Sequence, residues 1–537
     1  MGQLTVFDGH ETVGGTKIVL SDSDTDLVLD FGLNYARMNQ FYEEYLQPRS
    51  SRGIVDYIAM ELLPRIGNFY REDLFPTPDF PQGNTTWPGR PPAAVLLSHG
   101  HIDHAGAVSF LHPKIPLVAS PLTVALLRAW QEGGGHSLLS EVTYCSARSP
   151  SREDPRLLEP QRGRPKVGRN FALTSEAGSE FRELLSRSPL SGQNSEYRPG
   201  HLERFSGRVG NLCVRACPVD HSVYGAHGFL VETDGTLVAY TGDLRFHGER
   251  GADTEDFVQR LVSQRPEILI VEGTRLRGDP KEDEGPRTTE EEVRRTCEAD
   301  VRQYEGRLVV ADFGPRNVER LKTFRAIAAN TGRQLVLVPK DAYLLHLMGA
   351  VDPKIPRDLS PNGMRILREP TLRGSSWMDL VERAYFSAYL DPSDVVKNPA
   401  RWILCFSFFD ANDLVDLYKG CANGLWLYSS SEAHGEEQEF DFHRLEAWIR
   451  WAGMKQVGFQ LVSNGRGGRK VCFDRPEDRG RHASGHMPES DLQQLVLRIR
   501  PRRVVPVHTQ YPHAYERLLE NSGISLELPA PGRPVVW

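Results

Sequence analysis

The chain has 537 residues, of which 39% are hydrophobic and 25% are charged, a balance typical of a globular protein. Its length exceeds what one hydrophobic core supports, so we expect two or three domains, or one domain that carries a large insertion. The net charge of −7 excludes a protein that binds nucleic acid through overall basicity, so any contact with a polyanion must come from local patches.

The N-terminal segment "MGQLTVFDGHETVGG" lacks a basic stretch followed by an apolar one, so we expect no secretory signal. We also expect no membrane span, because the chain contains no apolar run of about 18 residues. The seven cysteines are scattered, and no second pair completes a zinc–thiolate site with Cys213 and Cys217. These features predict reduced thiols and a cytoplasmic protein without a membrane partner.

Short apolar runs separated by turns fill the first part of the chain. Three of them, over residues 4–9, 16–21 and 25–32, predict the antiparallel edge of a sheet. Residues 38–92 combine a helical pattern with a loop rich in Pro, Gly and Asn. Further along, the pattern predicts a strand over 93–98, a polar turn with a helix after it, a strand over 116–120 and a helix over 121–130.

Residues 146–208 are predicted to be a basic insertion. Within them, residues 146–170 hold seven basic and three acidic residues and four prolines, with almost no apolar periodicity. One interpretation is a flexible arm that contacts phosphates. The other, which we favour, is a solvated surface loop.

The pattern of the chain changes at about residue 275 and changes back at about residue 456. Between these points strands alternate with helices, and residues 307–339 and 401–430 each predict a βαβ unit. The sequence therefore predicts one α/β unit interrupted by another, with segments 1–274, 275–455 and 456–537.

The turn after the predicted strand over 93–98 reads "HGHIDH" and crowds ligand-type side chains together. Imidazole nitrogen and carboxylate oxygen bind zinc and similar ions, and a catalytic site keeps one position open for water. One ion needs three or four ligands, so further donors must come from other strand ends. The candidates are His99, His101, Asp103 and His104 in the turn, and His221, Asp243 and His508 after later strands.

These candidates suffice for two ions. We assign His99, His101 and His221 to one ion, Asp103, His104 and His508 to a second, and Asp243 to a position between them. Such a pair leaves room for a hydroxide between ions ~3.5–4 Å apart, an arrangement suited to phosphoryl chemistry. A lone His221 or His508 more often belongs to a core or surface, but their place at strand ends favours ligation.

The turn "HGHIDH" resembles the HxHxDH signature of the metallo-β-lactamase superfamily. "VLDFG" with Asp30, "DHS" with His221 and "TGD" with Asp243 resemble the motifs that flank it. The resemblance implies an αββα sandwich. It also implies that Asp30 holds the metal-binding turn and does not bind the ion itself.

Three later motifs resemble motifs A, B and C of the β-CASP nucleases: "VEGT" at Glu272, "HASGH" at His486 and "PVHTQY" at His508. In that family an α/β domain is inserted into the lactamase-like domain. The stretch from His482 onward resembles the bacterial and archaeal ribonuclease J branch, and we expect the separate C-terminal domain of that branch to be absent. The resemblance implies a ribonuclease that cleaves single-stranded RNA as a 5′–3′ exonuclease, an endonuclease or both.

The resemblance also implies roles for single residues. A hydroxide held between two divalent ions, zinc or alternatively manganese, attacks the phosphodiester, and Asp103 belongs to the catalytic set. His486, held by Glu272, donates a proton to the leaving group or stabilises the pentacovalent state. The alternatives are a structural strand-end carboxylate for Glu272 and a helix-start residue for His486. His482 and Ser484 resemble a pair that binds a terminal 5′-phosphate.

Several features depart from the family or leave alternatives open. "ADFGPRN" over residues 311–317 replaces a serine- and asparagine-rich turn, and "HTQY" replaces the usual His-Gly-Glu. His508 favours RNA, since relatives that act on DNA tend to have an apolar residue there. Three alternative functions remain: a DNA nuclease of repair or defence, a small-molecule metallo-hydrolase and a non-catalytic binding module. A homodimer remains an alternative to a monomer. The basic run before motif B is either a phosphate-binding or a solvated loop and contains Arg466, Arg469, Lys470, Arg475, Arg479 and Arg481.

Overall fold

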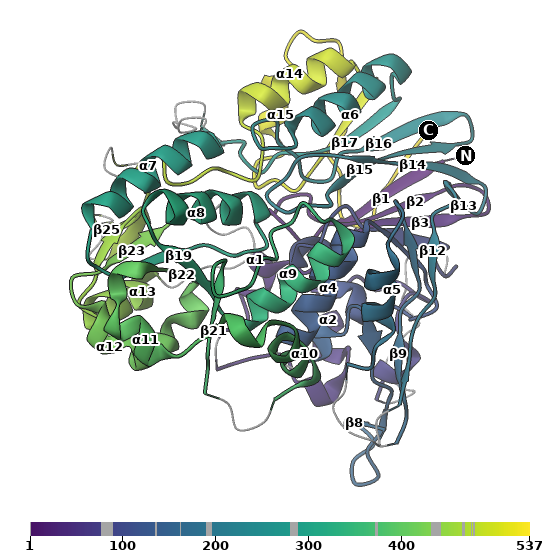
Figure 1. The fold of residues 1–537 in the computed structure, drawn as a ribbon. Coiled ribbons are helices and arrows are strands. Elements are labelled where there is room, and N and C mark those ends of the chain that lie inside the picture. Colours follow the sequence, from purple (N-terminus) through teal and green to yellow (C-terminus); the bar gives the residue numbers. More distant parts are fainter. Residues whose placement is uncertain are drawn as a thin grey trace.

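The computed structural model consists of a β-sandwich lobe and an α/β lobe, and the α/β lobe is formed by the middle of the chain (Figure 1). The residues it describes are 2–43, 45–76, 90–134, 137–161, 163–189, 196–279, 288–370, 374–430, 442–463, 465, 468–473, 475 and 478–537.

The first sheet of the sandwich has eight strands in the order β12-β10-β5-β4-β3-β2-β1-β29. Strands β1 to β3 pair antiparallel, as expected, whereas β3, β4, β5, β10 and β12 run parallel. The first and last strands of the chain, β1 and β29, are paired neighbours, so the two termini lie side by side (Figure 1). The bounds are β1 (Gln3–Asp8), β2 (Lys17–Ser21), β3 (Asp26–Phe31), β4 (Ala94–Leu96), β5 (Leu117–Ala119), β10 (Phe171–Leu173), β12 (Leu202–Arg204) and β29 (Pro534–Val536).

The second sheet has seven strands in the order β13-β14-β15-β16-β17-β27-β28. The strand β27 comes from the end of the chain and pairs parallel with β17, so the two outer segments form one unit. The bounds are β13 (Arg208–Val209), β14 (Leu212–Pro218), β15 (His227–Thr233), β16 (Thr236–Tyr240), β17 (Ile268–Glu272), β27 (Arg503–Val507) and β28 (Ser525–Leu526).

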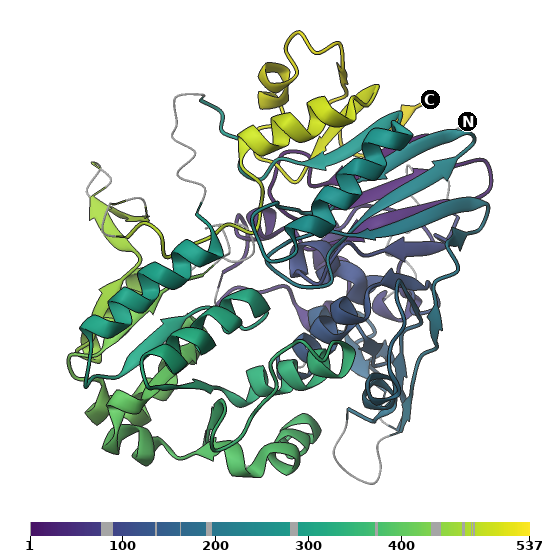
Figure 2. The same cartoon turned by 45° about the horizontal axis from the view of Figure 1, so that its top comes forward.

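Alternating side chains build the layers of this lobe. Leu27 and Leu29 of β3 face the second sheet and join a core with Phe229 and Ile270, whereas Val28 faces outward. The outer face of the first sheet is covered by α4 (Pro121–Gly133), and that of the second by α6 (Gly251–Gln264) and α14 (Glu489–Ile499). The αββα sandwich predicted from the sequence is confirmed (Figures 1 and 2).

The interpretation of residues 146–208 as one irregular insertion is wrong in part. Strands β10 and β12, with α5 (Ser179–Ser186) between them, complete the parallel edge of the first sheet. Strands of three residues are too short for a periodic signal, which is why the pattern did not reveal them. The preceding part forms the hairpin of β7 (Arg148–Pro150) and β8 (Leu158–Pro160), which projects from the sandwich lobe (Figure 1).

The inserted lobe is built on a seven-stranded parallel sheet in the order β21-β20-β19-β22-β18-β23-β24. The predicted boundary at residue 455 falls at the start of β24, and the hairpin of β25 (Gln460–Ser463) and β26 (Arg469–Cys472) also packs on this lobe. The strands are β18 (Val309–Asp312), β19 (Gln334–Leu337), β20 (Arg365–Leu367), β21 (Tyr389–Leu390), β22 (Trp402–Phe406), β23 (Leu425–Tyr428) and β24 (Lys455–Val457). The helices are α7 (Glu290–Gln303), α8 (Val318–Asn330), α9 (Pro339–Val351), α10 (Ser376–Tyr385), α11 (Pro392–Lys397), α12 (Leu414–Cys421) and α13 (Phe442–Trp451).

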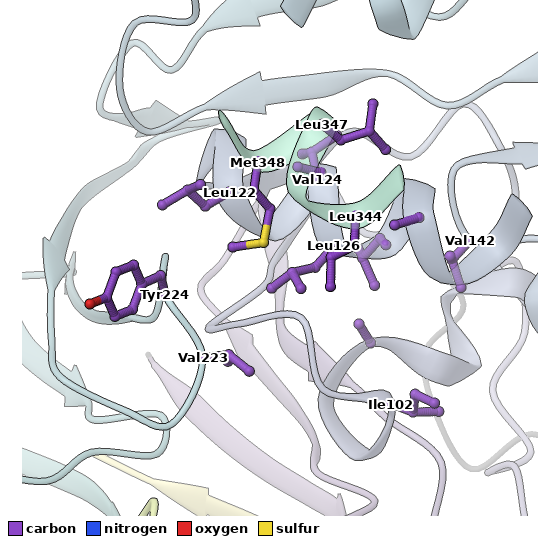
Figure 3. Close-up of a cluster of buried hydrophobic side chains, with 14 of the residues drawn as sticks. Ile102, Leu122, Val124, Leu126, Val142, Val223, Tyr224, Leu344, Leu347 and Met348 are labelled. Carbon is purple, nitrogen blue, oxygen red and sulfur yellow. The ribbon is translucent and has the colours of Figure 1, made fainter. Parts of the chain in front are cut away.

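The two lobes share an apolar junction between α4 of the sandwich and α9 of the insertion (Figure 3). Leu122 and Leu126 of α4 lie against Leu344 and Met348 of α9, and all four side chains are buried. Because these residues belong to one continuous buried cluster, the insertion is docked firmly on the sandwich.

Smaller elements complete the described part of the chain. They are α1 (Tyr35–Met38), α2 (Val55–Ala59), α3 (Ile102–Ala105), α15 (Ala514–Leu518), β6 (Tyr144–Cys145), β9 (Lys166–Gly168) and β11 (Tyr197–Arg198). Among the described helices, none is both long and apolar enough to cross a membrane.

Candidate metal centre

Every candidate metal ligand lies just beyond the carboxyl end of a sandwich strand, and each is at most 4% exposed. The turn after β4 carries His99 and His101 and continues into α3 with Asp103 and His104. The second sheet supplies the rest after β14, β16 and β27, namely His221, Asp243 and His508. The structure therefore brings together all seven residues that the sequence suggested.

A close approach of two main-chain segments fixes the turn. The N–H of Gly15 donates to the Asp103 carbonyl, and the N–H of Leu33 donates to the Ile102 carbonyl. The donor–acceptor distance is 3.0 Å in both bonds. A Cβ atom at Gly32 would lie 1.6 Å from the Asp103 carbonyl oxygen, so only glycine fits there. This packing holds α3, with Asp103 and His104, against the end of β3.

The first group of ligands consists of His99, His101 and His221. Their ligand atoms all lie within 4.8 Å of one another, and Nδ1 of His101 is 3.3 Å from Nε2 of His221. Three imidazoles at such distances can surround one ion.

The second group consists of Asp103, His104 and His508, whose ligand atoms lie within the same 4.8 Å limit. Oδ2 of Asp103 is 2.9 Å from Nε2 of His508. Oδ2 of Asp243 lies between the groups, 3.7 Å from Nε2 of His99 and 3.0 Å from Nε2 of His104. This is the position expected of a carboxylate shared by two ions.

The polar atoms of the centre fit a bound cation. Within the described part of the chain, Nε2 of His99, Oδ1 of Asp103 and Oδ1 of Asp243 are buried and make no hydrogen bond. A buried polar atom without a partner costs about 1–3 kcal/mol, and ligation of an ion removes that cost. The mixture of imidazole nitrogen and carboxylate oxygen suits zinc and also manganese.

The protonation of the centre also agrees with ligation. Burial lowers the pKa of His99 and of His221, so both imidazoles are neutral, which is the form that binds metal. Burial alone would raise the pKa of Asp243, but His104 and His508 outweigh it and hold that pKa well below its usual value. Burial lowers the pKa of His104 less than the surrounding carboxylates raise it, so an ion on this side must displace a proton.

Asp30 holds the centre without belonging to either group. Its fully buried carboxylate accepts from Ser98 N–H through Oδ1 at 2.7 Å, and from Ser98 Oγ at 2.6 Å, Tyr240 OH at 2.5 Å and His104 Nδ1 at 2.8 Å through Oδ2. The bond to Nδ1 leaves Nε2 of His104 for the ion. Tyr240 and Ser98 were not anticipated, because the pairing of Tyr240 with Asp30 joins the two sheets and no local pattern reports it.

The motif A and motif B residues meet beside the second group. Nδ1 of His486 lies 2.9 Å from Oε2 of Glu272, and both side chains are buried. Thr274 Oγ lies 2.6 Å from the same Oε2 and 2.8 Å from Nδ1 of His508. Glu272 is thus linked directly to His486 and, through Thr274, to a candidate ligand. Thr274 was not singled out from the sequence, although it ends the "VEGT" motif.

The two residues expected to bind a terminal phosphate lie on the same loop but differ in their surroundings. The ring nitrogens of His482 lie 2.6 Å from the Gly458 carbonyl and 3.2 Å from the Ser430 carbonyl, and burial lowers its pKa to about 4. Among the described residues, both nitrogens thus face main-chain carbonyl oxygens. Ser484 Oγ accepts from the His486 N–H at 3.1 Å. A phosphate role for both residues thus rests on resemblance alone.

The basic run before motif B forms ion pairs within the fold at two positions. Arg481 pairs with Asp300 of α7 at 2.7 Å, and Arg469 pairs with Glu446 of α13 at 2.9 Å. Arg466 lies outside the described residues. At these two positions the arginines join parts of the inserted lobe and its flanks. In the other basic segment, Arg169 is fully buried and donates to the carbonyls of Ser109 and Leu111.

Comparisons with known proteins agree with this centre. Residues 479–529, which include His486 and His508, match the family described as "Zn-dependent metallo-hydrolase RNA specificity domain". The chain is 21% identical over 545 residues to ribonuclease J of Pyrococcus abyssi, covering 97% of this chain and 93% of that protein. It is 23% identical over 449 residues to ribonuclease J of Mycobacterium tuberculosis, covering 81% of this chain and 62% of the relative.

A crystal structure of a protein of unknown function from Enterococcus faecalis V583 has the same fold, with a TM-score of 0.66, 19% identity and full coverage of both chains. The fold, the ligand set and the matched domain support a metallo-hydrolase of the metallo-β-lactamase type. The similarity to ribonuclease J proteins over most of the chain agrees with the resemblance that its motifs carry.

Proposed function

We propose that this chain is a metal-dependent ribonuclease that hydrolyses the phosphodiester bonds of single-stranded RNA. The observation that carries the proposal is the meeting of Glu272 and His486 with two groups of metal ligands that have Asp243 between them. A hydrolase of small molecules needs the ligands but has no use for this further pair. The similarity to ribonuclease J over most of the chain supports the same function.

The protein supplies position and protons for this reaction. Two divalent ions, when bound by the seven ligands, supply charge neutralisation at the phosphate and lower the pKa of the attacking water. Glu272 accepts a hydrogen bond from Nδ1 of His486 and so fixes the orientation of the imidazole ring. Proton donation from His486 then completes cleavage of the P–O bond.

The resemblance supports finer assignments within this proposal. Zinc is the expected ion, with manganese as the alternative. Ser484 and His482 would favour RNA with a 5′-monophosphate, and cleavage would run from the 5′ end, begin internally, or both. Binding of a phosphate by His482 would require its ring to leave the Gly458 carbonyl.

The test uses one single-stranded sequence made as RNA and as DNA, each with a 5′-monophosphate or a 5′-hydroxyl and a label at the 3′ end. The protein's metal content is measured, and Asp103→Asn serves as the blank. We expect metal-dependent loss of the 5′-phosphorylated RNA, with the product ladder distinguishing stepwise from internal cleavage. Cleavage of DNA alone would replace the proposal with a DNA nuclease, and cleavage of neither with both ions bound would reopen the small-molecule hydrolase.

A further inference from the structure

One fully buried arginine, Arg245, joins three parts of the molecule that meet at the active site. It lies two residues beyond Asp243, and its guanidinium reaches a different partner from each of its three nitrogens. Nε lies 3.1 Å from Asp220, Nη1 donates to the Ser484 carbonyl at 3.0 Å, and Nη2 lies 2.6 Å from Glu319. A buried arginine persists only when its donors are satisfied in this way.

The first partner, Asp220, precedes the candidate ligand His221. The Arg245 N–H donates to the Asp220 carbonyl at 2.8 Å, and the Gly248 N–H donates to its carboxylate at 2.8 Å. This part of the contact fixes the loop that carries His221.

The second partner, Ser484, belongs to the loop that carries His486. Its carbonyl also accepts from Nε2 of His247 at 3.0 Å, so two side chains of one segment hold it. Ser484 Oγ accepts from the His486 N–H, and the next carbonyl, that of Gly485, lies 2.7 Å from Nδ1 of His221. The position of His486 therefore depends on where Arg245 holds Ser484.

The third partner, Glu319, comes from the inserted lobe. It lies in the first turn of α8, is 8% exposed, and its second oxygen accepts from the Glu249 N–H at 2.8 Å. Glu319 thus grips the segment 245–249 at both ends. Because the α4–α9 junction docks the lobes firmly (Figure 3), the place of Glu319 relative to the sandwich is set by apolar packing.

We propose that Arg245 is a positioning residue through which Glu319 of the inserted lobe sets the proton-donating geometry of His486. The inference rests on the proposed function, in which His486 protonates the leaving oxygen. It assigns the insertion a part in catalysis besides substrate contact. Neither Arg245 nor Glu319 touches the reacting atoms.

The test compares Glu319→Gln with a matched control, Glu180→Gln. Glu180 on α5 of the sandwich also pairs with an arginine of the inserted lobe, Arg357, at 2.7 Å. Each variant is assayed on an RNA oligonucleotide, whose leaving alkoxide needs a proton, and on bis(p-nitrophenyl) phosphate, whose leaving phenolate does not. Metal content and thermal unfolding are measured on the same samples.

We expect Glu319→Gln to lower kcat on RNA by about ten- to a hundredfold, because a shift of about 1 Å at a catalytic group has effects of that size. Turnover of bis(p-nitrophenyl) phosphate and metal content should stay within twofold of the unsubstituted protein, and Glu180→Gln should leave both substrates unaffected. Arg245→Lys keeps the positive charge beside Asp220 but loses the guanidinium nitrogen that donates to Ser484. It should reproduce the selective loss of kcat on RNA. This variant tests the inference if Glu319→Gln does not fold.

An equal fall in kcat on both substrates, or no fall in kcat on either, would overturn the inference but would not contradict the proposed function. An unsubstituted protein with a full complement of ions that fails to cleave RNA would overturn the proposed function, and the inference with it.

Discussion

Replacing Asp30 with asparagine tests how much of the metal centre depends on a residue that binds no ion. The substitution keeps the shape of the side chain. Asp30 has a φ of 54°, a conformation that asparagine also tolerates, so the backbone should not be strained. What changes is the charge and the number of hydrogen bonds that the side chain can accept.

The expected loss of metal affinity follows from the contacts of Asp30. Its two oxygens face Ser98 N–H, Ser98 Oγ, Tyr240 OH and His104 Nδ1, all within 2.8 Å. The NH₂ of asparagine would face some of these donors, so His104 would lose the partner that orients Nε2 towards the ion. Loss of such a supporting contact weakens metal binding ~10–100-fold, equivalent to about 1.4–2.7 kcal/mol.

The assay is a zinc titration of metal-free protein against a competing chelator, with RNA cleavage measured at saturating zinc. Asp26→Asn is the control, since Asp26 is a buried carboxylate of the same strand that pairs with Arg90 at 3.2 Å. We expect weaker binding only for Asp30→Asn, with most activity restored at high zinc. Equal zinc affinity in Asp30→Asn and the unsubstituted protein would show that Asp30 does not support the metal centre.

Further predictions concern catalysis, docking and pH. His486→Ala should lower turnover on RNA by about a hundredfold or more with metal content intact, and loss of ions measured by mass spectrometry would instead make His486 a ligand. Met348→Ala, at the fully buried lobe junction, should cost about 2–5 kcal/mol in chemical denaturation, and an unchanged midpoint would contradict the docking described here. Burial raises the pKa of Asp312 to about 8, with the Trp426 N–H opposing it. A raised folded pKa means that the native state holds this proton between about pH 4 and 8, so stability falls as pH rises through that window, by on the order of 1 kcal/mol per unit. Asp312→Asn should make the slope shallower by this amount without removing it, because burial also raises the pKa of Asp341, Glu319 and Glu369. An unchanged slope in denaturant melts across this range would count against the assignment.

Residues with distinctive chemistry could be predicted from the sequence, because each belongs to a short pattern that is visible in the local sequence. The turn from His99 to His104 combines three imidazoles with a carboxylate, and His221, Asp243 and His508 each follow a strand whose end could be placed from its apolar run. Strand ends of a sandwich meet at one edge, so the grouping followed from topology. The interrupted α/β architecture was predictable for the same reason, since long strands and helices carry strong periodicity.

The contacts that hold this centre could not be predicted, because they form between distant segments. Tyr240 donates to Asp30 across the sandwich. The local sequence around Arg245 does not distinguish it from other charged loop residues, because its partners Glu319 and Ser484 are distant in the chain. The strands β10 and β12 are too short for a periodic signal. His482 was grouped with phosphate ligands by its motif, yet its ring nitrogens lie against carbonyl oxygens.

The number of ions needed for RNA cleavage distinguishes a two-ion centre from a one-ion centre. Metal-free protein is titrated with zinc while hydrolysis of a 5′-phosphorylated single-stranded RNA is followed. The two ligand groups with Asp243 between them predict that activity rises to its maximum at two equivalents and is abolished by Asp103→Asn at every zinc concentration. Full activity at one equivalent, or activity that persists in excess chelator, would show that cleavage does not require two bound ions.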